Sequence, residues 1–232
     1  MNQAIKKVIG PRITADEWAA HRGRYLLPTG LLVLAAMMLL VSIFMPFWNM
    51  ALNAPQYPGG LHVVGYVNRI TGDVHEIDEL NHYIGMRKLD EAAQLEKSLS
   101  IMMIVALSLL VVGAVFIHNR WAALLTLPAL TFPAGFLLDL HLWLSYFGNN
   151  LDPTAPLSNA IKPFTPPVLG TGTVGQFTTV ATPGPGLILA TVASVVILIA
   201  LWRHRAAYKP LVEQQAPSGA GTSPSGEPNL AD

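Results

Sequence analysis

Long apolar runs, separated by more polar segments, dominate the pattern of residues along this chain. Four such runs cover residues 25–48, 99–117, 121–147 and 186–202. A helix needs about 17–25 predominantly apolar residues to cross the hydrocarbon layer of a membrane, and irregular backbone cannot face lipid. Each run is long enough, so the pattern predicts an all-α membrane protein with four transmembrane helices.

The composition agrees with this prediction. The chain is 52% hydrophobic and only 12% charged, whereas soluble domains typically carry about 25% charged residues. The first run is too long for the apolar core of a cleaved signal peptide, and no small-x-small cleavage motif follows it. We therefore expect the first run to remain in the protein as a helix.

The basic residues are distributed unevenly around the four runs. Nine of the fourteen flank the same set of helix ends: Lys6, Lys7, Arg12, Arg22, Arg24, Arg120, Arg203, Arg205 and Lys209. Loops rich in Lys and Arg stay in the cytoplasm. This predicts cytoplasmic termini, with a basic segment at 1–24 and a disordered tail at 203–232. Residues 49–98 and 148–185 are then extracytoplasmic.

Residues 49–98 have the mixed pattern of a small folded subdomain. The stretch Leu61–Ile70 is rich in β-branched and aromatic residues, and the same pattern resumes at Val74–Ile77 after the turn sequence "TGD". These features predict a β-hairpin. Asp78 is placed to cap a following helix, and Gly85 to end it in a left-handed conformation. The expected unit is a β-hairpin-plus-helix subdomain between the first two transmembrane helices.

The second outer segment and the third run carry many prolines. Residues 148–185 hold seven prolines and five glycines without a helical period, which predicts a Pro/Gly-rich loop with one short strand in "VGQFTTVA". In the third run, Pro128 and Pro133 are expected to kink the helix and to open a groove beneath the outer subdomain.

Two ionisable residues, Asp139 and His141, lie near the outer end of the third run. Ionisable groups within a membrane helix are candidates for a functional role. Residues two positions apart on a helix point about 200° from each other, so these two do not form one site. Asp139 lies about 27 Å above the start of the run, close to water. Tethering of the outer loops is therefore the alternative role.

The candidate metal ligands of the outer segments are imidazoles and thioethers, because the chain has no cysteine. They are His82, Met86, His62, His75 and Met50. This combination suits copper, above all Cu(I). His82 and Met86 would share one face of a continuous helix, but Gly85 is expected to interrupt that helix. The alternatives are solvated histidines that bind no metal and a packing role for Met86.

Other chemistries find no support in the sequence. It contains no HExxH, CxxCH or phosphate-loop motif and no basic patch typical of nucleic-acid binding. We therefore expect a protein that is not an enzyme, with no cofactor other than copper and no nucleic-acid partner.

One stretch, "APQYPGGLHVVGYVNRITGDVHEIDELNHYIGM", resembles a block in small polytopic membrane proteins associated with nitrous-oxide reductase accessory clusters. Such systems supply copper and electrons to an extracytoplasmic multicopper enzyme. The resemblance implies an accessory protein of denitrification in the bacterial inner membrane, whose outer face handles copper or docks a copper-handling partner. It marks as candidate contacts Tyr57, His62, His82, Tyr83 and Met86.

Two hypotheses for the function remain open. In the first, the protein is an accessory or maturation factor that presents Cu(I) to an extracytoplasmic enzyme. In the second, it is a non-catalytic structural subunit of a membrane respiratory or transport complex, docked to a membrane or periplasmic partner through Tyr57, Tyr83 and Ile84, since aromatic side chains often anchor interfaces. In both, the lipid bilayer surrounds the four helices.

Overall fold

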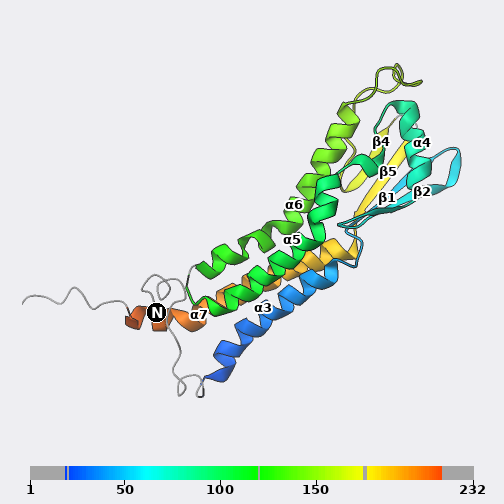
Figure 1. Cartoon of the computed structure of the whole chain (residues 1–232). Helices are drawn as coiled ribbons and strands as arrows, with labels where there is room; N and C mark the ends of the chain where they lie inside the picture. The colour runs from blue at the N-terminus through cyan, green and yellow to red at the C-terminus, as the bar shows by residue number, and fades with distance from the viewer. Residues whose placement is uncertain (1–18, 20, 120, 175–176, 216–232) are drawn as a thin grey trace, which may run out of the picture.

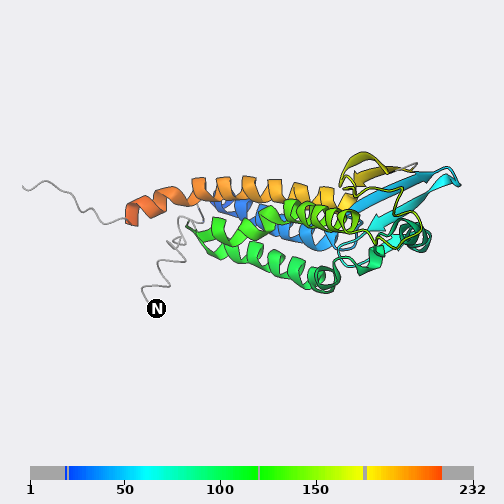
Figure 2. The ribbon, with the colours of Figure 1, turned by 90° about the horizontal axis from the view of Figure 1, so that it is seen from above.

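The structure is a computed structural model that describes residues 19, 21–119, 121–174 and 177–215. Its elements are α3 (Arg22–Ser42), β1 (Trp48–Ala54), β2 (Tyr57–Gly65), β3 (Ile70–Gly72), α4 (Val74–Ile84), η1 (Leu89–Glu91), α5 (Gln94–Gly113), η2 (Ala114–Phe116), α6 (Trp121–Asn149), β4 (Gly170–Val174), β5 (Phe177–Pro183) and α7 (Pro185–Gln215). Four long helices run together, and a small antiparallel sheet caps one end of the bundle (Figures 1 and 2).

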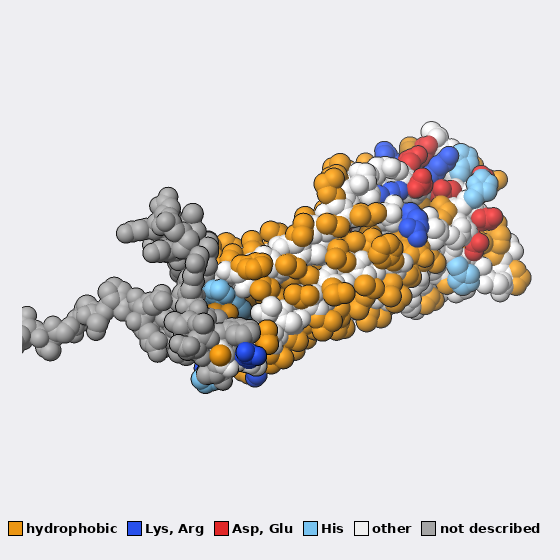
Figure 3. Space-filling view, turned by 60° about the horizontal axis from the view of Figure 1, so that its bottom comes forward, with side chains coloured by type: hydrophobic (Ala, Val, Ile, Leu, Met, Phe, Trp, Pro, Cys, Tyr) orange, Lys and Arg blue, Asp and Glu red, His pale blue; other side chains and the backbone are white. Residues whose placement is uncertain are grey.

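The four long helices are apolar enough to cross a membrane. The candidate spans are Arg22–Ser42, Gln94–Phe116, Trp121–Asn149 and Pro185–Tyr208. The predicted number of spanning helices is therefore confirmed by length and composition. Hydrophobic side chains cover the visible side of the bundle, while acidic side chains gather at the sheet end (Figure 3). This surface suits a multi-pass membrane protein surrounded by lipid.

Within the bundle, each helix packs against two neighbours. α3 packs against α5 and most extensively against α7, and α6 packs against α5 and α7. Ala35 of α3 and Ala190 and Ala193 of α7 are fully buried in the same core cluster. Small residues let helix backbones approach closely within a membrane, where apolar burial against lipid provides little driving force. Dispersion contacts between these closely packed helices therefore hold the bundle together.

The sheet has the strand order β3-β2-β1-β5-β4, with all neighbours antiparallel. β1 lies at its centre, and Met50 stands opposite Val63 of β2 and Ala181 of β5. The two polar segments of the sequence thus form one sheet. The short strand expected in "VGQFTTVA" is present as β5, but the hairpin β4–β5 places much more of this segment in regular structure than the sequence indicated.

The predicted hairpin between Leu61–Ile70 and Val74–Ile77 is wrong. β2 pairs with β1 and with the short β3, whereas Val74–Ile77 forms the first turn of α4. Asp73 ends the strand pairing, because its backbone N–H donates to the His62 carbonyl and its carboxylate accepts from the His62 N–H, both at 2.8 Å. The helix accordingly starts at Val74, so Asp78, the expected cap, lies inside α4 rather than at its start.

Two helix ends differ from the sequence expectation. α3 ends at Ser42, so the last residues of the first apolar run form a connection and the start of β1. α7 continues to Gln215, so residues 203–215 are helical rather than disordered. Residues 1–18 and 216–232, which include most of the predicted basic segment and the rest of the tail, lie outside the described residues.

The sheet domain is joined to the bundle by a close crossing of two chain segments. Gly184, which directly precedes α7, donates its N–H to the Phe47 carbonyl at 2.9 Å, and Gly186 donates to the Pro46 carbonyl at 2.8 Å. A Cβ at Gly184 would collide with the backbone of Pro46. This crossing sets the sheet directly on the ends of α3 and α7.

Candidate binding cavities beneath the sheet

The structure does not bring the five candidate metal ligands together. His62 lies exposed on the sheet, and His75 and His82 lie exposed on α4. Met86 is buried, and Met50 is partly buried. Within the described part of the chain, no group of three or more His, Asp or Glu side chains is arranged to hold a metal ion.

The separation of His82 from Met86 follows from the way α4 ends. Gly85 has φ +80° and ψ +15°, the left-handed conformation predicted for it. The Met86 N–H donates to the Asn81 carbonyl at 2.9 Å, as in a Schellman motif. In this motif the residue after the glycine commonly makes a hydrophobic contact, and Met86 packs with Ile84 and Phe147. Met86 therefore turns into the core while His82 stays in solvent.

The loop that follows α6 covers this end of α4. Gly85 accepts a hydrogen bond from the Asp152 N–H at 2.8 Å, and Tyr83 accepts one from the Leu157 N–H at 2.9 Å. The Thr154 hydroxyl and backbone N–H both donate to the Asp152 carboxylate and lower its pKa, with a smaller effect from the charge of His82. The loop between α6 and β4 thus holds the end of α4 in place.

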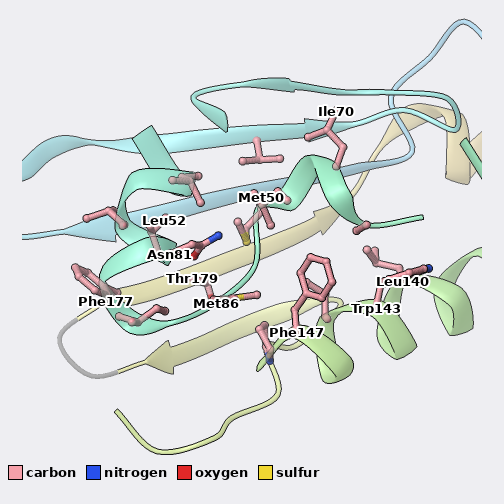
Figure 4. A pocket seen from close by; sticks show the side chains of 18 of the residues that line it. Met50, Leu52, Ile70, Asn81, Met86, Leu140, Trp143, Phe147, Phe177 and Thr179 are labelled. Atoms are coloured by element: carbon pink, nitrogen blue, oxygen red, sulfur yellow. The ribbon is translucent and has the colours of Figure 1, made fainter. Parts of the chain in front are cut away.

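A small cavity of about 110 Å³, here called the sheet cavity, lies between the sheet, α4 and the end of α6 (Figure 4). Its lining is almost wholly apolar. The walls comprise Trp48, Met50, Leu52, Val63, Ile70, Ile77, Leu80, Asn81, Ile84, Met86, Leu89, Ala92, Leu140, Trp143, Leu144, Phe147, Phe164, Pro166, Phe177 and Thr179. Met50 and Met86, which lie far apart in sequence, therefore line one cavity.

Asn81 is the unexpected polar residue of the sheet cavity. Its side chain is 7% exposed, and its Nδ2 has no hydrogen-bond partner among the described residues. Leaving a buried donor unpaired costs about 1–3 kcal/mol. Thr179, the other polar wall residue, instead hydrogen-bonds the Gly172 carbonyl at 3.4 Å. Asn81 is therefore available to donate to an acceptor atom on a ligand in this cavity.

A larger cavity of about 590 Å³, here called the groove, lies between α5 and α6 beneath the sheet. It includes Pro128 and the exposed Gly135 among its lining residues, and α6 changes direction along its length (Figure 1). Next to Pro128, the Thr131 hydroxyl lies 3.2 Å from the carbonyls of Leu127 and Pro128. A groove is thus present where the prolines were expected to open one.

Asp139 and His141 differ in their surroundings, as their spacing predicts. Asp139 lines the groove together with Glu96, whereas His141 is not among its lining residues. In the described structure, Asp139 makes no hydrogen bond or ion pair that would tether an outer loop. Its carboxylate is therefore available to a ligand in the groove.

The three candidate docking residues also differ in accessibility. Tyr83 is 50% exposed on α4, whereas Ile84 is 6% exposed and packs in the core. Tyr57 is partly buried against the sheet core. Of the three, Tyr83 presents the most accessible surface to a partner.

Comparison with known proteins does not place this chain in a family: no family profile matches it, and no curated protein matches it significantly. The sequence nonetheless carries one signal for the cavity. Trp48, Met50 and Leu52 alternate with polar or small residues, the period of a strand with one buried face. That alternation would have placed Met50 on an inner sheet face, but nothing local identifies Asn81 as a wall residue.

Proposed function

We propose that this protein is an integral-membrane accessory factor for an extracytoplasmic copper enzyme of the nitrous-oxide-reductase kind, with its sheet domain outside the cytoplasm. The charge distribution supports this orientation, since Arg22 and Arg24 of α3 and Arg203 and Arg205 of α7 lie at the bundle end away from the sheet. Basic residues favour the cytoplasmic side. The accessory role rests on the resemblance of residues 54–86 described above.

The observation that carries the copper proposal is that two thioethers line the same sheet cavity. Met50 reaches into it from the central strand and Met86 from the segment after α4 (Figure 4). Thioether sulfur is a soft donor that selects Cu(I) over hard cations. The chain has no cysteine thiolate that would compete for the ion. These two methionines are therefore the best-supported donors for Cu(I).

The donor set fits copper as a cargo rather than as a resident cofactor. Two thioethers leave coordination positions open, as a site that passes its metal to another protein requires. The Asn81 amide N–H is a hydrogen-bond donor, so it would hold an acceptor atom that accompanies the metal rather than the metal itself. The three exposed histidines lie outside the cavity lining and are candidates for receiving or passing on the ion.

The test is Cu(I) binding by the full-length protein in detergent, measured against a competing chelator. The double variant Met50→Leu, Met86→Leu removes both sulfur atoms while nearly keeping side-chain volume. We expect it to weaken Cu(I) binding by at least about tenfold, the scale on which even outer-shell changes act at metal sites. The isolated segment 49–98 is unsuitable, because β1 would lose its partner β5.

Matched variants separate the thioether site from other possibilities. Met37→Leu, Met102→Leu removes two methionines that are 58% and 69% exposed on the bundle, and we expect no loss of Cu(I) affinity. His62→Ala, His82→Ala tests the imidazoles. Parent-like affinity in the Met50, Met86 variant would show that the sheet cavity is not the copper site.

One observation favours the alternative of a structural subunit in a respiratory or transport complex. Tyr83 exposes half of its surface on α4, beside the exposed His82. Large exposed aromatic residues often serve as interface anchors. If the native protein co-purifies with a stoichiometric partner, Tyr83→Ala releases that partner, and Cu(I) does not bind, the docking role replaces the copper role.

A further inference from the structure

We propose that the groove between α5 and α6 binds one phospholipid with an ammonium head group, phosphatidylethanolamine, from the membrane leaflet on the sheet side. The acyl chain would lie along the groove, and the ammonium group would meet the carboxylates of Glu96 and Asp139. The groove adjoins the sheet cavity and shares six lining residues with it, but the lipid proposal does not depend on copper binding.

The position of the groove identifies lipid as its occupant. Both walls are spanning helices, with Met103 on α5 and Phe132 on α6 among the lining residues. Met103 is 45% exposed and Gly135 is exposed, so the groove opens to the lipid-facing surface of the bundle. In a membrane, such a surface is in contact with acyl chains.

The length of the groove matches one leaflet. Its lining along α5 extends from Glu96, near the sheet, to Leu107. At about 1.5 Å per residue this stretch rises about 16 Å, while half of a hydrocarbon core about 30 Å thick is about 15 Å. The volume of about 590 Å³ lies within the range of roughly 300–1,000 Å³ typical of small-molecule sites. One chain therefore fits along the groove.

The charges at the sheet end of the groove specify the head group. Glu96 and Asp139 both line it. The neighbouring Lys97 is paired with Asp90, with Nζ and Oδ1 3.0 Å apart. The carboxylates of Glu96 and Asp139 leave this end of the groove negatively charged. This charge favours a head group that carries an ammonium and disfavours an anionic head group that carries none.

A space-filling substitution tests occupancy of the groove. Gly135 lines the groove, and a Cβ there would have no heavy atom within 4 Å. Gly135→Leu should fold and occupy space that the chain needs. We measure, by native mass spectrometry of the full-length protein, how much phosphatidylethanolamine remains bound after purification in detergent containing equal amounts of phosphatidylethanolamine and phosphatidylglycerol. Retention should fall about tenfold, as expected when several chain carbons are displaced.

Two matched controls make the result specific. Gly30→Leu adds the same bulk on α3, where a Cβ also has open space, and should retain lipid as the parent does. If Gly135→Leu does not fold, Met103→Trp fills the groove from α5, with Met102→Trp, which lies outside the lining, as its control. Parent-like retention in the groove-filling variant, or an equal loss in its control, would overturn the proposal.

The head-group assignment has its own readout. The double variant Glu96→Gln, Asp139→Asn removes both negative charges while nearly keeping side-chain shape. It should lose the preference for phosphatidylethanolamine over phosphatidylglycerol but still retain lipid. A parent protein without that preference, or a double variant that keeps it, would contradict recognition of an ammonium group by these carboxylates.

Discussion

At the scale of single residues, Gly85 determines where the side chains of "ELNHYIGM" point. Its left-handed backbone ends α4 between His82 and Met86, so one side chain meets solvent and the other enters the core. The same residue contacts the loop after α6, because its carbonyl accepts the Asp152 N–H. A single glycine thus fixes both the cavity wall and the covering loop.

Gly85→Ala should therefore destabilise the fold and disturb the sheet cavity. The left-handed conformation costs a non-glycine residue about 1–2 kcal/mol, and a Cβ would lie 2.6 Å from the Asp152 carbonyl oxygen. We expect a loss of about 2 kcal/mol or more in the free energy of unfolding. Thermal unfolding in detergent measures it.

The control for this change is Gly59→Ala in β2, where a Cβ has open space and φ is not positive. Its unfolding midpoint should stay close to that of the parent. A Gly85→Ala midpoint equal to that of Gly59→Ala would mean that the left-handed turn does not constrain this region.

At the scale of elements, aromatic stacking joins the α5–α6 turn to α7. The His118 ring stacks on Tyr208, with ring centroids 4.2 Å apart, and lies 5.7 Å from the His204 ring. Burial lowers the pKa of His118, and its Nδ1 has no hydrogen-bond partner in the described structure. Protonation would place a charge among stacked rings, so the stack favours the neutral imidazole.

This arrangement predicts a loss of stability on acidification. The His118 pKa is lower in the folded than in the unfolded protein, where it is about 6.5, so the unfolded state binds more protons at acidic pH. The contribution of neutral His118 is fully present above about pH 6.5 and decreases as pH falls toward the folded pKa. His118→Phe keeps the ring but cannot titrate, so its unfolding midpoint should fall less between about pH 7.5 and pH 5. An equal fall in the unfolding midpoint of the parent and of His118→Phe over this pH range would contradict this role of His118.

How far the sequence predicts these elements depends on whether the signal is local. The four apolar runs and Gly85 carry local signals, and the structure contains the expected helices and helix end. The β-branched residues of Val74–Ile77 indicate a strand, but their spacing with Leu80 and Ile84 is that of one helix face. The pairing of β1 with β5 joins residues far apart in sequence, and no local pattern specifies such a partner.

The candidate site shows the same division. The sequence identifies Met50 and Met86 as candidate ligands by residue type, but it does not show that they line the same cavity. Met50 and Met86 line one cavity only because β1 lies at the sheet centre and Gly85 redirects the chain. Asn81 and Thr179 became wall residues through tertiary packing, which periodicity alone does not predict.

At the scale of the whole molecule, the two ends of the bundle differ in character. The sheet, both cavities and the acidic side chains visible in Figure 3 gather at one end, and the arginines at the start of α3 and near the end of α7 lie at the other. The groove is lined mainly by the spanning helices α5 and α6, whereas the sheet cavity is lined mainly by the sheet, α4 and the end of α6. Copper handling requires that the sheet end face away from the cytoplasm, whereas the lipid site does not depend on that orientation.

Sidedness is therefore the measurement that tests the account most directly. The chain has no cysteine, so single cysteines report on position without background labelling. Gln56 is exposed in the β1–β2 turn, and Arg205 is exposed on α7 at the opposite end of the molecule. The two variants are Gln56→Cys and Arg205→Cys. With a membrane-impermeant maleimide on intact spheroplasts, we predict labelling at position 56, and at position 205 only after permeabilisation. Labelling of position 205 but not 56 in intact spheroplasts would contradict the proposed orientation and the copper role that depends on it.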